Sequence, residues 1–263
     1  MSDDEIEIIP NEEDSQSLES GFSFSWFKLI IGVVICYFWL FDGWDSLIVL
    51  LSLIFVVVIH ELGHVVIGKS FGCIIEEMQV FLLSFVSYQP KQVAGNSSWR
   101  NIKWSLGTLP LGGFTAFMTR PTDAVDDAEE LLPGEYAIRT SPYIDDKPAW
   151  QRLLIDAGGV LFNCATFLIV YPLLSHLPSS WYVFCATTAF MSLIMAVFNF
   201  LPVFPLDGGR IIFSFYELVT GKKPSPKFVN ICGAVGFILI ILFFWILPGW
   251  TDAIINPLLE ILF

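Results

Sequence analysis

The sequence predicts an all-α polytopic membrane protein with about five transmembrane helices and a small membrane-associated β segment in a cytosolic middle loop. Composition is the first reason: 55% of the 263 residues are hydrophobic and 16% are aromatic, whereas soluble domains are roughly 45–50% apolar. The second reason is that several apolar stretches are long enough, or nearly so, to cross about 30 Å of hydrocarbon. The expected spans cover residues 24–41, 47–68, 153–174, 181–200 and 228–247.

The basic residues predict how these spans are oriented. All 13 Lys and Arg residues fall at Lys28, within residues 69–152 or within residues 210–227. The segments at the opposite ends of the expected spans contain no Lys or Arg. Because positively charged residues collect on the cytosolic side of a membrane, we expect a cytosolic N-terminus and a cytosolic middle loop.

The net charge of −13 comes largely from residues 1–20 and 123–135. A solvated acidic tail and an acidic loop explain both runs, and such acidity makes nucleic acid an unlikely partner. We expect two parts: residues 1–22 form an acidic cytosolic tail, and residues 23–263 form a single membrane-embedded domain.

The middle loop contains two stretches that are typical of strands. Residues 77–88 and 101–118 are rich in Val, Ile, Leu, Phe and Trp with partial alternation, and Gly95-Asn96-Ser97-Ser98 lies between them. This pattern predicts a strand, a turn and a second strand.

The motif His60-Glu61-Leu62-Gly63-His64 follows an apolar run over residues 47–59. A helix turns about 100° per residue, so both imidazoles project from one face and can reach one zinc ion, with Glu61 beside the open coordination position. The alternative is a pair of hydrogen-bonded core histidines. Ionisable groups inside a span are costly and usually functional, and two of only 3 histidines flank a glutamate here. The motif therefore favours a catalytic metal site.

Such a site needs a third protein ligand, for which Asp207 is the best candidate. It lies in the segment Asn199–Gly209, where prolines and glycines break a span at its cytosolic end. The second and fourth spans both run towards the cytosol, so their ligands arrive at the same membrane face. The alternative for Asp207 is an ordinary turn aspartate. The competing ligand is Asp156, the other in-span carboxylate on that face.

These motifs resemble those of the site-2 proteases, zinc metalloproteases that cut substrates within the membrane. The family's HExxH matches His60–His64, and its Asn-x-x-Pro-x-x-Pro-Leu-Asp-Gly matches Asn199–Gly208 without a gap. The resemblance implies one zinc ion (Zn2+) per chain, with Glu61 as the base. Its implied metal ligands are His60, His64 and Asp207. The membrane domain is then a metalloprotease domain of a compact type that lacks a PDZ domain.

The resemblance also implies where a substrate binds. The family's Gly-Pro-x-x-Asn is similar to Gly159–Asn163, with Val160 in place of proline, and its asparagine helps to hold the substrate backbone. The alternative for Asn163 is an interhelical hydrogen bond. Leu109–Phe114 is similar to the family's β segment, whose edge strand could pair with an unwound substrate; the alternative is a self-contained hairpin. The substrate-binding residues expected on this basis are Asn163, Asn199, Pro202, Pro205, Gly112 and Gly113.

We therefore expect an intramembrane zinc endopeptidase that cleaves a single-span membrane protein near the cytosolic face. The expected setting is regulated intramembrane proteolysis, in the lipid bilayer of a bacterial inner membrane, after a first cut by another protease. A catalytically idle scaffold that binds membrane proteins is one alternative, and a zinc-handling membrane protein is another. The intact Glu61 argues against the first, and the lack of a further His- or Asp-lined path argues against the second.

Overall fold

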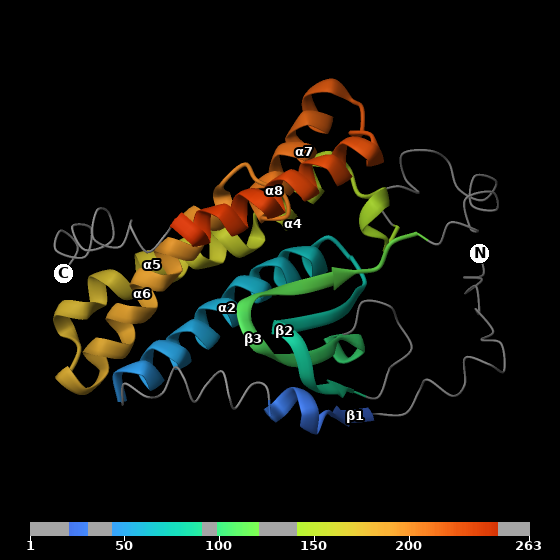
Figure 1. Cartoon of the computed structure of the whole chain (residues 1–263). Coiled ribbons are helices and arrows are strands. Elements are labelled where there is room, and N and C mark those ends of the chain that lie inside the picture. Colours follow the sequence, from blue (N-terminus) through green and yellow to red (C-terminus); the bar gives the residue numbers. More distant parts are fainter. Residues whose placement is uncertain (1–20, 31–43, 91–98, 121–140, 247–263) are drawn as a thin grey trace, which may run out of the picture.

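The structure, a computed structural model, describes residues 21–30, 44–90, 99–120 and 141–246. A bundle of helices lies beside a small twisted sheet (Figure 1). The helices are α2 (Trp44–Ser70), α4 (Ala149–Asp156), α5 (Gly158–Leu173), α6 (Ser179–Phe200), α7 (Asp207–Thr220) and α8 (Pro226–Ile246). The strands are β1 (Gly21–Phe24), β2 (Ile75–Gln89) and β3 (Lys103–Phe117). Short 3-10 turns cover Trp99–Asn101, Ile144–Asp146 and Leu174–His176.

Among the described residues, four helical segments are long and apolar enough to cross a membrane. They correspond to the second, third, fourth and fifth expected spans. Most of the first expected span, residues 24–41, lies outside the described residues, and Phe24 ends a strand instead of starting a helix. The four segments cover Leu47–Ser70, Gly158–His176, Ser179–Phe200 and Pro226–Phe243.

The third expected span, residues 153–174, starts later in the structure. Its first residues belong to α4, and the chain turns at Ala157 before α5 begins. The backbones of α2 and α5 touch just beyond this turn: a Cβ on Gly63 would lie 2.3 Å from Gly158 O, and one on Gly158 would lie 2.7 Å from Gly63 O. Small residues allow this kind of close helix contact in membranes, and here it brings α5 against the HExxH turn of α2.

The two expected strands are confirmed as β2 and β3, and each bends back on itself. Residues 77–80 pair with residues 113–116 on one side and with residues 103–106 on the other, while residues 86–88 pair again with this second segment. β1 pairs antiparallel with the outer part of β2. The sheet therefore has β1 at one edge and residues 113–116 at the other (Figure 1). The expected turn over residues 95–98 lies outside the described residues.

The bend in β2 has an unusual backbone. Phe81 and Leu83 have φ angles of 64° and 57°, a left-handed conformation that bulky residues rarely adopt. The side-chain amide of Gln79 donates a hydrogen bond to Phe81 O at 2.7 Å. A Cβ on Gly107 would lie 2.1 Å from Leu82 O, so glycine is needed where β3 passes under the bend.

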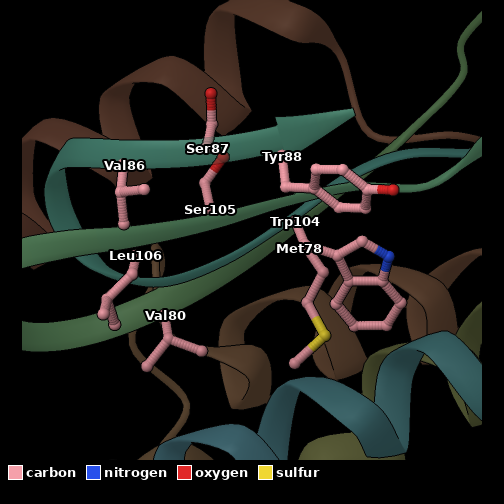
Figure 2. A pocket seen from close by; sticks show the side chains of 8 residues that line it. All are labelled: Met78, Val80, Val86, Ser87, Tyr88, Trp104, Ser105 and Leu106. Carbon is pink, nitrogen blue, oxygen red and sulfur yellow. The ribbon is translucent and has the colours of Figure 1, made fainter. Parts of the chain in front are cut away.

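One face of the sheet packs on α2. Met78 and Val80 join Val57 and Val65 in the buried core, and Trp104 and Leu106 pack against it from β3. Figure 2 shows these strand side chains on the same face, whereas the side chains of Ser87 and Ser105 point the other way. This alternation fixes the register of the sheet against α2. It therefore also fixes which residues at the edge of β3 lie beside Glu61.

Candidate active site

The two histidines of the motif lie on one face of α2, as their spacing predicts. His60 and His64 are buried, with 3% and 7% of their surfaces exposed, and their ring centroids are 5.1 Å apart. Glu61, between them in sequence, is also buried. Three buried ionisable side chains within one turn need polar or charged partners, and the neighbouring elements supply them.

Asp207 is the first residue of α7 and follows the irregular segment 201–206. Its Oδ2 atom lies 3.0 Å from His60 Nε2 and 3.3 Å from His64 Nε2. One donor atom from each of the three residues falls within 4.8 Å of the others, which makes them the candidate metal-binding group among the described residues. Two imidazoles and a carboxylate form a common catalytic zinc set that leaves a coordination position open.

A bound metal ion fits this arrangement of atoms. His64 Nδ1 lies 2.7 Å from Ile155 O, so Nδ1 carries the proton and donates to this carbonyl, and Nε2 presents a lone pair. Asp207 Oδ2 is buried and has no hydrogen-bond partner in the described part of the chain. Lone pairs and a negative charge that converge without a proton between them require a cation, so the residues present fit zinc.

Asn163 on α5 lies beside the other histidine. Its side-chain Nδ2 atom lies 3.1 Å from His60 Nδ1, and the residue is fully buried, with 0% exposure. With the amide turned by about 180°, its oxygen accepts a hydrogen bond from Nδ1–H, and Nε2 of His60 is then free to bind the metal. Asn163 thus contacts His60, a candidate metal ligand. Its role in holding substrate stays a prediction.

Gly159 brings α5 up against both imidazoles. A Cβ at this position would lie 2.4 Å from His60 Cε1 and 2.5 Å from His64 Nε2. Because real Cβ atoms do not approach this closely, only glycine fits here. The sequence motif included Gly159 but did not reveal this contact.

Glu61 is held by the far edge of the sheet. Thr115 Oγ1 donates a hydrogen bond to Glu61 Oε2 at 2.8 Å, and a Cβ on Gly113 would lie 3.0 Å from Glu61 Oε1. Both residues belong to β3, and their i, i+2 spacing places them on the same face of the strand. Sequence reasoning missed Thr115, although its spacing from Gly113 was the signal that could have found it.

The remaining predicted residues are not part of the metal-binding group. Asn199, near the end of α6, donates from Nδ2 to Met195 O of its own helix at 3.1 Å. Pro202 and Pro205 lie in the irregular segment before α7. Gly112 has a φ of 77° and faces open space. These four residues stay predictions as substrate contacts.

Asp156, the competing ligand, has another partner. Its Oδ2 accepts a hydrogen bond from Ser214 Oγ at 2.9 Å, and it is not part of the metal-binding group. Burial raises the pKa of the Asp156 carboxyl to about 6. This carboxyl links α4 to α7 beside the site.

Comparison with known proteins assigns the chain to a family. The model of peptidase family M50 matches residues 48–182 and 175–243, which together make up most of the chain. The chain belongs to peptidase family M50. The resemblance to the site-2 proteases noted from the motifs is thereby confirmed. With four apolar helices in the part of the chain that the structure describes, this family member is an integral membrane protein.

Relatives and a solved structure support the assignment. The chain is 30% identical to the metalloprotease MmpA of Caulobacter vibrioides over 138 residues, which cover 48% of this chain and 33% of that protein. It is 49% identical over 59 residues to a putative zinc metalloprotease of Thermotoga maritima, covering 22% of this chain and 12% of the relative. The matches thus span a third or less of these curated relatives. The site-2 protease from Methanocaldococcus jannaschii shares the fold, with a TM-score of 0.53, 18% identity, and coverage of 89% of this chain and 88% of that one.

Proposed function

We propose that this M50 family member is an intramembrane zinc endopeptidase that cleaves a single-span membrane protein near the cytosolic face. The observation that carries the proposal is the convergence of His60, His64 and Asp207 beside Glu61, in the C-terminal half of the apolar helix α2. The names of relatives in Caulobacter vibrioides and Thermotoga maritima support a metalloprotease activity and, for the second, zinc.

The chain's own residues have distinct parts in the reaction. Zinc, when bound, polarises the scissile carbonyl and lowers the pKa of water to about 7. Glu61 accepts the proton of the attacking water at its carboxylate and returns it to the leaving amine. The hydrogen bond from Thr115 to Oε2 holds this carboxylate in place, and burial of Glu61 keeps bulk water from competing for it.

The sheet offers a means of presenting the substrate. Peptide bonds in a transmembrane helix are shielded by their own hydrogen bonds, so a substrate must be unwound before cleavage. β1 covers one edge of the sheet, whereas the edge formed by residues 113–116 passes Glu61. An unwound segment that added to this edge would gain main-chain hydrogen bonds regardless of its side chains. Gly112 lies just before this edge and faces open space, and Gly113 begins the edge with its backbone close to Glu61.

We place the protein in the inner membrane of a bacterium, with its N-terminus and its β segment on the cytosolic side. The distribution of Lys and Arg supports this orientation, and the bacterial relatives support the membrane. In this setting the enzyme acts in regulated intramembrane proteolysis, on a substrate already shortened by another protease. Cleavage then releases a cytosolic fragment.

The test combines metal analysis with cleavage of a defined substrate. The full-length chain, purified in detergent and reconstituted in vesicles, is assayed for zinc content and for cleavage of a model single-span protein. We expect about one zinc per chain and cleavage that a zinc chelator abolishes. Glu61→Gln keeps the shape of the side chain but removes the proton acceptor, so we expect normal zinc content with a loss of activity of at least a thousandfold, on the order of 4 kcal/mol.

Two outcomes would count against the proposal. Normal turnover by the Glu61→Gln variant would exclude the mechanism. A wild-type protein that binds zinc and the substrate but never cleaves it would indicate a catalytically idle scaffold of the same fold.

A further inference from the structure

The last span, α8, has an outer face for lipid and meets the rest of the protein along its other side. Side chains such as Ile231, Val235 and Ile238 are more than half exposed. On the other side, Gly233 and Gly236 face Phe204, which lies in the irregular segment just before Asp207. We propose that α8 positions Asp207 through this contact, with Gly236 as the positioning residue. The inference rests on the zinc site of the proposed function.

The contact at Gly236 is one of backbone against backbone. A Cβ on Gly236 would lie 1.7 Å from Phe204 O and 2.8 Å from Phe204 C. At Gly233, one turn away, a Cβ would meet only ring atoms of Phe204, at 3.1 and 3.2 Å. Rotation of the side chain can move the ring atoms by a few tenths of an ångström. A backbone carbonyl oxygen cannot move unless the backbone itself moves.

Phe204 is held from the opposite side as well. A Cβ on Gly209, in the first turn of α7, would lie 2.5 Å from Phe204 N and 2.6 Å from its Cα. The backbone of Phe204 is therefore clamped between α7 and α8 by two glycines, Gly209 and Gly236. Leu206 N donates to Val203 O at 2.9 Å, which tightens the same segment.

Two aromatic pairs fix α8 on either side of Gly236. Phe243 packs on Phe198 of α6 with ring centroids 4.9 Å apart. Phe228 packs on Phe213 of α7 at 6.2 Å. Because α8 is attached before and after Gly236, a side chain at that position would displace the segment of Phe204 more readily than the whole helix.

Displacement of this segment reaches the metal site directly. Asp207 follows Phe204 by three residues, and its Oδ2 is the atom that meets both imidazoles. Metal sites tolerate errors in ligand position of about 0.2 Å. The clamp thus couples the helix most exposed to lipid to the ligand contributed by α7.

The experiment measures zinc affinity by chelator competition in the detergent-purified full-length chain. We expect Gly236→Ala to raise the zinc Kd at least tenfold and Gly233→Ala, the matched control one turn away, to change it less than twofold. Phe204→Ala keeps the backbone but removes the ring, so we expect an intermediate rise in Kd. If Gly236→Ala protein does not accumulate, the Phe204→Ala result decides.

Substitution of Co2+ for zinc separates repositioning from loss of stability. The visible absorption of bound Co2+ reports ligand geometry, so we expect Gly236→Ala to change its intensity and Gly233→Ala to preserve it. Wild-type zinc affinity and cobalt spectrum in Gly236→Ala would overturn the inference, as would equal losses in the two glycine variants. Because no substrate is involved, a wild-type protein that binds zinc without cleaving would refute the proposed function but leave the clamp intact.

Discussion

Replacing Gly159 with alanine tests the contact between α5 and both histidine ligands. The added Cβ would lie 2.4 Å from His60 Cε1 and 2.5 Å from His64 Nε2, whereas ordinary contact begins at 3.4 Å. The rings or the helix must therefore retreat by about 1 Å, several times the tolerance of roughly 0.2 Å for metal ligands. We expect the zinc Kd to rise at least a hundredfold, about 2.7 kcal/mol.

The direction of this effect distinguishes the contact from helix propensity. Inside a helix, Gly→Ala ordinarily stabilises by about 1 kcal/mol, so a loss at Gly159 must come from the imidazoles. Zinc affinity by chelator competition and Tm in detergent are measured together. The control is Leu161→Ala on the same helix, because the Leu161 side chain is 48% exposed. Gly159→Ala protein that binds zinc as tightly as the wild type would refute the packing argument.

The remaining predictions concern residues around the metal ligands. Thr115→Val removes the hydrogen bond to Glu61, so we expect kcat to fall about tenfold or more with zinc content unchanged, and Thr115→Ser to restore it. Asn163→Leu removes the partner of His60 Nδ1, and we expect zinc affinity to fall 10- to 100-fold, by roughly the usual cost of losing such a partner. Asp156→Asn should stabilise the zinc-free protein at neutral pH, by an amount on the order of 3 kcal/mol.

The sign of the last prediction follows from linkage. The pKa of the Asp156 carboxyl is raised from 3.8 to about 6, chiefly by burial, so the folded chain binds this proton more tightly than the unfolded chain. Wild-type stability therefore falls as pH rises from about 4 to 6, and Asp156→Asn removes that part of the slope. The free energy of unfolding measured against pH checks this. Identical slopes in the two proteins would contradict the prediction, as would Thr115→Val with full kcat or Asn163→Leu with unchanged zinc affinity.

Much of the site follows from local sequence rules. The i, i+4 spacing of His60 and His64 places them on one face wherever α2 is helical, and the prolines before Asp207 mark the break that lets α7 begin there. Alternating hydrophobic residues predicted β2 and β3 within a few residues of their ends. These features depend on periodicity and on residues with restricted backbones.

Other features depend on contacts between distant segments, which periodicity does not encode. The double bend of the sheet requires Phe81 and Leu83 in a left-handed conformation that their side chains disfavour, so no propensity rule predicts it. The partners of Glu61 and His60 lie 54 and 103 residues away. Even with its ligands known, the support of the metal site therefore required the structure.

The position of the motif along α2 has a consequence for the products. His60 and His64 precede the end of α2 at Ser70 by ten and six residues, and a helix rises about 1.5 Å per residue, so the candidate centre lies roughly 9–15 Å inside that end. A substrate cut at this depth would leave a stub of former membrane residues on its released part. The stub would number about six to ten residues if it were helical and about three to five if it were extended, at roughly 3.3 Å each. Hydrocarbon burial of so short a stub is far less than the approximately 20 residues of a full span provide, so the fragment would detach from the membrane by itself.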